Sequence, residues 1–358
     1  MSIIQQIHDT QIANADKELH WYITSVIVPE LPQLIETLDL CSNLLLYNTP
    51  QHPDPTQQIL RGPPVKLPLT SNKSEILKGI LIRDGPYIVQ LSIMLHQSNF
   101  NKVIHKLDLI KPVLLHQIIT AKKALDSSID NLQQFIEMNQ HGSHLCDLNH
   151  NVLIDLFNKL LSNISISKQS LQIPLNPNLV FPNNVIQADF FRPELPSNIA
   201  IDLYLNQAEI CIDLKKLHII NELPWSKIEN GKSYVDNIRE EMKLPSIQTT
   251  SGAPSTAAST PQLKSEPLKL SDLDSKLKTL RDSNFLNNML NSLNFKPKLD
   301  PVDYITKCVT FNDMVVMVNT KIDVSSPDPI LTSVFTKLDS IEYLLSSFLQ
   351  NLDGISSV

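Results

Sequence analysis

The spacing of apolar residues changes repeatedly along this chain of 358 residues, and these changes divide it into helical segments and strand segments. Spacings of three and four residues are typical of amphipathic helices, whereas alternation of apolar and polar residues is typical of strands with one face in water. The expected helices span Asp16–Leu46, Lys111–Ile136, Leu153–Ile164 and Pro329–Leu352, and the expected strands lie within Ile76–Leu95, Lys102–Ile110, Ile199–Leu214 and Tyr304–Val324. The predicted order is therefore α, β, α, β, α.

Both ends of the chain are helical, and the middle helices connect strand segments, so neither kind of layer is continuous in sequence. We predict an α+β fold with a discontinuous helical bundle, made of the N-terminal, central and C-terminal helices, and a separate antiparallel β-sheet domain built from hairpins. The helical domain is expected at 15–47, 111–172 and 327–353, and the β domain is expected at 75–110, 195–224 and 302–325.

Turn-forming residues mark the interruptions. Pro29 and Pro32 lie inside the first helical pattern, where each removes a backbone donor, so we expect a kink or two abutting helices. Arg83-Asp84-Gly85-Pro86 predicts a hairpin in which Gly85 takes the positive φ. Strict alternation across Asn206-Gln207-Ala208 predicts a second hairpin with one face in water. The polar, low-complexity composition around Ser246–Pro267 predicts that 226–300 is a mostly disordered insert, which could contain a short helix at 270–295.

Composition narrows the classes of partner and compartment. The formal net charge is -7 and no block of five or more Lys or Arg occurs, so nucleic acid is not an expected partner. The four cysteines are far apart, and the first residues lack the pattern of a signal peptide, which favours a reducing compartment. No window approaches about 18 consecutive apolar residues, so we expect no direct insertion into a membrane.

The motifs of nucleotide-binding and hydrolytic enzymes are absent from the sequence, and we predict no catalytic site and no cofactor. Asp84 and Asp213 are interpreted as solvated surface residues. One constellation could bind zinc through ligands of the right kind, although a solvated loop with a helix cap explains it equally well and is the preferred interpretation. This cluster consists of His141, His144, Cys146 and His150.

Two further features have both a structural and a functional interpretation. Trp225 and Tyr204 could anchor a partner, because aromatic residues dominate interface hot spots, but single aromatics near sheet ends more often fill a core. The apolar stripe of Pro329–Leu352 could bind a partner helix or complete the bundle of its own chain. Short connections and the absence of a sustained heptad charge pattern favour packing within the chain.

The stretch FFRPELPSNIAIDLYLNQAEICIDLKKLHIINELPW, which ends at Trp225, resembles the most characteristic segment of the Rogdi family. In that family an apolar-Pro-x-Leu-Pro-Ser turn leads into a hairpin that ends in a Leu-His pair. Weaker similarities occur at Glu18–Tyr22 and at Lys307–Val309. The resemblance covers 15–350 and leaves the role of the matched positions, structural or partner contact, unassigned. The motif positions are Pro193, Leu195, Pro196, Ser197, Leu217, His218 and Trp225.

The resemblance implies a non-catalytic subunit of the RAVE complex, which promotes reassembly of the peripheral sector of the vacuolar and endosomal proton ATPase (V-ATPase) onto its membrane sector. It implies three kinds of partner: a large WD-repeat subunit, a Skp-type adaptor and V-ATPase peripheral-sector subunits. It also implies a cytoplasmic protein that partners recruit to vacuolar and endosomal membranes. The alternatives are a helical scaffold in another multisubunit complex, for transcription or membrane tethering, and a zinc-binding protein that uses the His141–His150 cluster.

Overall fold

The computed structural model describes residues 3–70, 77–96, 105–140, 150–243 and 299–356. The chain divides into two compact units: unit 1 contains residues up to Lys215 together with Thr320 onward, and unit 2 runs from Lys216 to Asn319. Helices and antiparallel sheets confirm the predicted α+β class. These two units differ from the predicted division of the chain into a helical domain and a β domain. That predicted division remains an interpretation.

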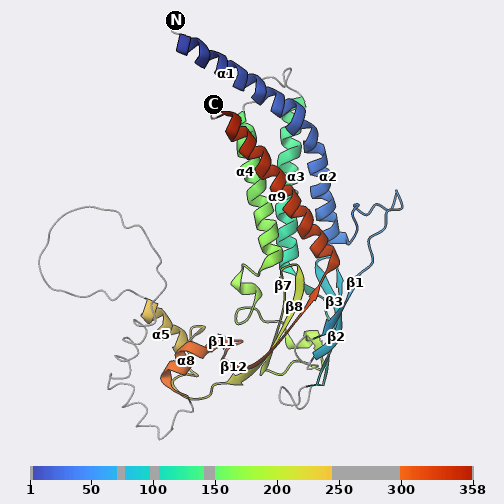
Figure 1. Cartoon of the computed structure of the whole chain (residues 1–358). Coiled ribbons are helices and arrows are strands. Elements are labelled where there is room, and N and C mark those ends of the chain that lie inside the picture. Colours follow the sequence, from blue (N-terminus) through green and yellow to red (C-terminus); the bar gives the residue numbers. More distant parts are fainter. Residues whose placement is uncertain (1–2, 71–76, 97–104, 141–149, 244–298, 357–358) are drawn as a thin grey trace, which may run out of the picture. The chain divides into compact units, whose positions relative to one another are not determined.

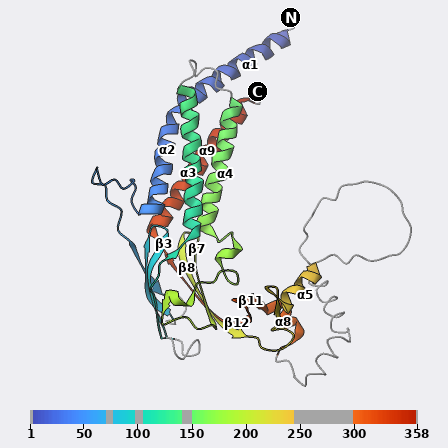
Figure 2. The same ribbon diagram turned by 180° about the vertical axis from the view of Figure 1, so that it is seen from behind.

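Unit 1 contains a bundle in which α2 packs on α3, α3 on α4, α4 on α9, and α9 back on α2 (Figures 1 and 2). Helix α1 precedes α2 and contacts α9, so it extends the bundle at the end where both termini lie (Figure 1). The predicted bundle of N-terminal, central and C-terminal helices is therefore present. The helices are α1 (Ile3–Tyr22), α2 (Val28–Tyr47), α3 (His116–Gln140), α4 (His150–Gln172) and α9 (Pro329–Ser356).

Helix α9 carries the regular apolar repeat that closes the bundle. Seven buried side chains follow one another at alternating steps of three and four residues, which is the spacing of a coiled-coil seam. Phe348 contacts Phe157 of α4 with ring centroids 5.7 Å apart. The stripe thus packs within its own chain, as predicted. The seven residues are Leu331, Val334, Leu338, Ile341, Leu345, Phe348 and Leu352.

The predicted interruption of the first helix is a π-helical turn, Ile23–Ile27, between α1 and α2. The amide of Val28 donates to the carbonyl of Ile23, five residues back. Pro29 follows directly and has no amide hydrogen, so the α-helical ladder cannot continue through it, and the wider turn absorbs the mismatch. Pro32 lies inside α2.

The first sheet of unit 1 has the strand order β1-β2-β3-β4-β6, with β5 paired to β3. The turn between β2 and β3 confirms the predicted hairpin, and Gly85 has a φ of +56°. Strand β1 was not predicted, because it follows a proline-rich loop and contains Pro68 itself. The strands are β1 (Val65–Thr70), β2 (Leu77–Asp84), β3 (Tyr87–Leu95), β4 (Lys106–Leu109), β5 (Val113–Leu114) and β6 (Phe191–Arg192).

The second sheet has the order β11-β12-β8-β7, and its strands β8 and β12 each run from unit 1 into unit 2. The hairpin between β7 and β8 turns through Gln207 and Ala208, both with positive φ, where the sequence predicted a turn. The strands are β7 (Ile199–Asn206), β8 (Glu209–Ile219), β11 (Cys308–Phe311) and β12 (Met314–Pro327).

One continuous core joins the helices of unit 1 to the inner faces of both sheets. Leu38 and Leu338 of the bundle belong to the same buried cluster as Leu81 of the first sheet and Ile212 of the second. A bundle and two sheets that share a core are expected to unfold together.

Unit 2 corrects the sequence interpretation in two places. The predicted strand at Tyr304 is a helix, α8 (Pro301–Lys307), because Pro301 suits a first helical turn and Tyr304 and Ile305 bury on one side. Part of the predicted disordered insert is also ordered, as β9 (Ile228–Glu229), β10 (Lys232–Ser233) and α5 (Tyr234–Lys243). The rest of that insert, including the helix expected at 270–295, lies outside the described residues.

The ordered part of the insert has local signals that the composition concealed. Asn230 and Gly231 both have positive φ between β9 and β10, as in the Asn-Gly hairpin turn. The amide of Asp236 then donates to the hydroxyl of Ser233 at 3.2 Å, and the amide of Ser233 donates to the carboxylate of Asp236 at 3.1 Å. This reciprocal pair starts α5 as a capping box does.

Candidate interaction site

The first family-motif residues form the turn between β6 and β7 in unit 1. Leu195 is buried in the core, and its amide donates to the carbonyl of Ala188 at 3.3 Å. The carbonyl of Pro196 accepts from the amide of Ile199 at 3.0 Å, which starts β7. Pro193 and Ser197 are exposed. This part of the motif therefore combines one core anchor with exposed turn residues.

The remaining motif residues belong to unit 2. Trp225 is 2% exposed and stacks on Tyr304 with ring centroids 4.7 Å apart and an interplanar angle of 2°. Tyr234 meets the same indole edge-on at 5.6 Å. Leu217 is also buried, whereas His218 is exposed. Trp225 is a core residue, so the structure favours its structural interpretation over that of a partner anchor.

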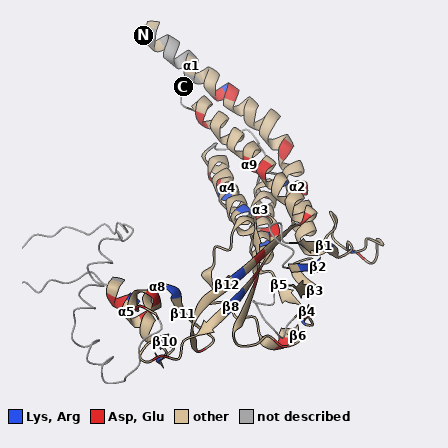
Figure 3. Cartoon of the chain, turned by 60° about the horizontal axis from the view of Figure 1, so that its bottom comes forward, with Lys and Arg blue, Asp and Glu red and all other residues tan. Residues whose placement is uncertain are grey.

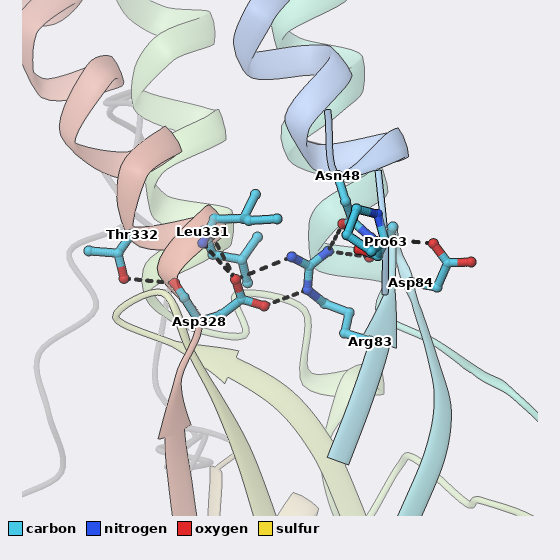
Figure 4. Close-up of polar contacts among 9 residues, drawn as sticks. Asn48, Pro63, Arg83, Asp84, Asp328, Leu331 and Thr332 are labelled. Atoms are coloured by element: carbon cyan, nitrogen blue, oxygen red, sulfur yellow. Dashed lines mark hydrogen bonds and ion pairs between the residues drawn. The ribbon is translucent and has the colours of Figure 1, made fainter. Parts of the chain in front are cut away.

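A fully buried ion pair ties the bundle to the first sheet (Figure 4). Arg83 of β2 donates from Nε to Asp328 at 2.6 Å and from Nη2 to the other carboxylate oxygen at 3.2 Å, and both side chains have no exposed surface. Asp328 also caps α9, because it accepts from the amides of Ile330 and Leu331 at 2.9 and 3.1 Å. One carboxylate thus fixes both a helix start and a strand.

The same arginine reaches the end of α2. Its Nη1 donates to the side-chain oxygen of Asn48 at 3.0 Å and to the carbonyl of Gly85 at 2.7 Å. Asn48 ends α2 in the left-handed conformation, with a φ of 57°. The sequence pattern places Arg83 in a turn and indicates no role for it. A β-bulge beside Arg83 and the inward alternation of β2 direct it into the core.

A second polar cluster corrects the interpretation of Asp213 as a solvated residue. Asp213 is 5% exposed and accepts from Lys321 at 3.0 Å and from the Tyr204 hydroxyl at 3.3 Å. Lys215 pairs with both Asp202 and Asp213, and the amide of Phe181 donates to Asp202 at 3.1 Å. The segment around Phe181 covers this face of β7 and β8, so the predicted wet face of the hairpin is wrong.

Burial also determines the chemistry of this cluster and of the cysteines. Desolvation raises the pKa of Asp202, against the opposing effects of Lys215 and the Phe181 amide. It raises the pKa of the Tyr204 hydroxyl, and Asp213 adds to that rise. Burial raises the pKa of Cys41 and Cys211 to about 12, so both remain thiols at neutral pH. These groups are suited to structure more than to nucleophilic chemistry.

The zinc interpretation is not tested by the described residues, because His141, His144 and Cys146 lie outside them. His150 is the first residue of α4. Within the described part of the chain, no three His, Cys, Asp or Glu side chains are grouped to hold a metal ion.

A pocket of about 320 Å³ lies at the start of α3, and His116 is its titratable lining residue. The side chain of the neighbouring Gln117 is fully hydrogen-bonded. Its Nε2 donates to the carbonyls of Ser170 and Leu205, and its Oε1 accepts from the amide of Leu205. Gln117 therefore joins α3 to α4 and β7.

A bundle closed by its own heptad helix and tied to the first sheet by a buried ion pair defines a bundle-and-sheet scaffold. Its second buried cluster of charges joins β7, β8 and β12 of the second sheet. The chain belongs to the family described as Rogdi leucine zipper containing protein, whose model matches residues 18–353. Helix α9 carries the leucine repeat of this chain, and the repeat is buried inside the bundle.

Two curated fungal relatives carry the same name, "Regulator of V-ATPase in vacuolar membrane protein 2". The protein of Saccharomyces cerevisiae is 26% identical across 95% of this chain and 91% of the relative. The protein of Schizosaccharomyces pombe is 24% identical across 75% of this chain and 94% of the relative. Among the helices that the structure describes, none has the length and apolarity required for a membrane span.

Proposed function

We propose that this chain is a non-catalytic subunit of the RAVE complex that promotes assembly of the V-ATPase by binding other proteins. The observation that carries the proposal is the similarity to a protein named as a V-ATPase regulator over 95% of this chain and 91% of that relative. Because the match spans nearly the whole of both chains, the shared role belongs to the whole fold more than to one module.

The absence of a catalytic role is part of the proposal, and the uses of the buried charges support it. Arg83 and Asp328 bond each other, and their further hydrogen bonds go to Asn48, to the carbonyl of Gly85 and to the first amides of α9, so both charges are used at a structural junction. Lys215 neutralises Asp202 in the second cluster. Enzymes instead keep a charged group available for the substrate, with a pKa suited to its task.

The proposed partners are a large WD-repeat subunit, a Skp-type adaptor and subunits of the peripheral V-ATPase sector. We further propose that the chain is cytoplasmic and reaches vacuolar and endosomal membranes through these partners. Recruitment by partners fits a chain whose described helices include no membrane span.

Affinity purification of the tagged full chain from its native cells, in mild salt, tests the proposal. Mass spectrometry should identify a WD-repeat protein together with peripheral-sector subunits of the V-ATPase. Recovery of the chain alone would refute the proposal, and recovery with a transcription or tethering complex would favour the scaffold alternative. Elemental analysis of the same preparation tests the zinc alternative, because metal bound through His144 and Cys146 should disappear on their replacement by alanine and serine.

A further inference from the structure

The first sheet of unit 1 has an outer face that points away from the core. Residues directly opposite each other on neighbouring strands share a face. The register places Lys78 opposite Met94, and Met94 opposite Lys106. Lys66, Ile80 and Arg192 lie on the same face by the alternation and pairing of their strands. We call these six exposed residues the outer sheet face.

The outer sheet face is basic in a protein that is acidic overall. Four of its six residues are Lys or Arg, and the half-buried Asp108 lies on the same face opposite Arg192, whereas the whole chain has a net charge of -7. Residues 3–47 show the contrast, since α1 and α2 carry six carboxylates and one lysine; acidic positions along α1 appear in Figure 3. An anionic ligand would therefore be attracted to the sheet and repelled by the first helices.

Two apolar side chains lie within this basic frame. Met94 is 48% exposed, and its neighbours on the adjacent strands are Lys78 and Lys106, each about 4.8 Å away in the direction of the backbone hydrogen bonds. Ile80 is 41% exposed on strand β2, which lies between β1 and β3. A ligand that offered only charges would leave both apolar side chains in water, so the face suits a ligand that is both acidic and apolar.

We propose that the outer sheet face binds an acidic segment of a partner protein whose apolar side chains cover Ile80 and Met94. Carboxylates of that segment would pair with the surrounding Lys and Arg side chains. The inference deepens the proposed function, and it rests on that function only for the premise that the chain works through protein partners.

The neighbouring carboxylate of Asp108 favours a protein ligand over an anionic membrane. Asp108 lies opposite Arg192 and accepts from Lys106 at 2.8 Å and from Ser92 at 2.6 Å. The hydrogen bond from Lys106 is the largest of the effects that lower the pKa of Asp108, so this group is charged at neutral pH. A bilayer of anionic lipids would press phosphates against it, whereas a protein segment can place a neutral or donor group there.

The test uses the purified full-length chain and labelled peptides of about ten residues, the upper range for a strand, in which Glu or Asp alternates with Leu, Ile or Val. Binding is measured by fluorescence anisotropy for the wild-type chain and for Met94→Glu. The matched control is Met138→Glu, the same change at a methionine of α3 that is 74% exposed. Peptides with Lys in place of the acidic residues, and phosphatidylcholine–phosphatidylserine vesicles, are measured in parallel.

The proposal predicts that acidic–apolar peptides bind the wild-type chain and the Met138→Glu variant equally. Met94→Glu should weaken this binding at least about tenfold, and raising salt from about 50 mM to about 300 mM should weaken it as well. The proposal is overturned if these peptides do not bind the wild-type chain, if Met94→Glu binds them as well as Met138→Glu does, or if the basic peptides or the vesicles bind instead. If a Met94→Glu chain loses peptide binding but still co-purifies V-ATPase subunits, the outer sheet face is supported as the peptide site and the proposed function stands. Failure of the wild-type chain to co-purify V-ATPase subunits would refute the proposed function itself.

Discussion

Replacing Asp328 with serine should destabilise unit 1 strongly, because it leaves the buried guanidinium of Arg83 without its counter-ion. Serine can still cap α9, so the substitution isolates the ion pair from the helix cap. Both side chains of the pair are 0% exposed. Removing one partner of a buried, hydrogen-bonded pair costs about 3–5 kcal/mol, and we expect a loss in that range for Asp328→Ser.

The double variant Arg83→Met with Asp328→Ser separates the cost of an unpaired charge from the contribution of the pair. Removing both charges eliminates the buried unpaired ion, so the double variant should regain about half or more of the stability lost by Asp328→Ser. The Nη1 bonds of Arg83 to Asn48 and Gly85 are lost only in the double variant, which limits the recovery.

The free energy of unfolding would be measured by urea denaturation of the full chain, followed by far-ultraviolet circular dichroism, which reports mainly the helices of unit 1. Asp189→Ser is the control, because Asp189 and its partner Lys111 are each 49% exposed and such pairs contribute less than about 1 kcal/mol. A loss below about 1 kcal/mol for Asp328→Ser, or a double variant less stable than the single one, would refute this reasoning.

Three further predictions concern other parts of the fold. Leu338→Ala removes a side chain with no exposed surface and should cost about 2–5 kcal/mol in urea unfolding, whereas Tyr343→Ala, at a site 77% exposed on the same helix, should change stability by less than about 0.5 kcal/mol. Cys41 and Cys211, whose pKa values burial raises to about 12, should resist a thiol reagent at about pH 8 until the chain unfolds; labelling of the native chain as fast as of the unfolded one would contradict their burial. Desolvation opposes ionisation of Asp236, but hydrogen bonds from Thr310 and Ser233 outweigh it and lower its pKa, so its stabilisation is present above the unfolded pKa of about 3.9 and is lost as pH falls through the lower folded value. The protection of α5 amides, measured as the exchange rate relative to the intrinsic rate at the same pH, should therefore fall on acidification, and Asp236→Asn should flatten that dependence.

Periodicity predicted the elements that bury one stripe. The repeat from Leu331 to Leu352 and the stripe from Leu153 to Ile164 gave the correct helices, because each must cover one side with other helices. The hairpins around Gly85 and Gln207 were also predicted correctly, since their turn residues and flanking strands agree. Local sequence was sufficient wherever the local and tertiary preferences coincide.

The errors occur where distant segments decide the environment. The face of β7 and β8 that alternation assigned to water is covered by the segment around Phe181, which lies 21 residues before its contact Asp202. Arg83 is paired with a residue 245 positions away, and nothing near Arg83 in the sequence indicates Asp328. The Asn230-Gly231 hairpin was different, because its signal was local and the low complexity of the following segment obscured it.

Promotion of V-ATPase assembly can be measured as the amount of peripheral-sector subunits that sediment with vacuolar membranes from cells that lack this chain. Our account predicts that this amount falls while the membrane sector stays constant, and that the full-length chain restores it after the two sectors have been separated. An unchanged amount of peripheral sector on the membranes of cells without the chain would contradict the account.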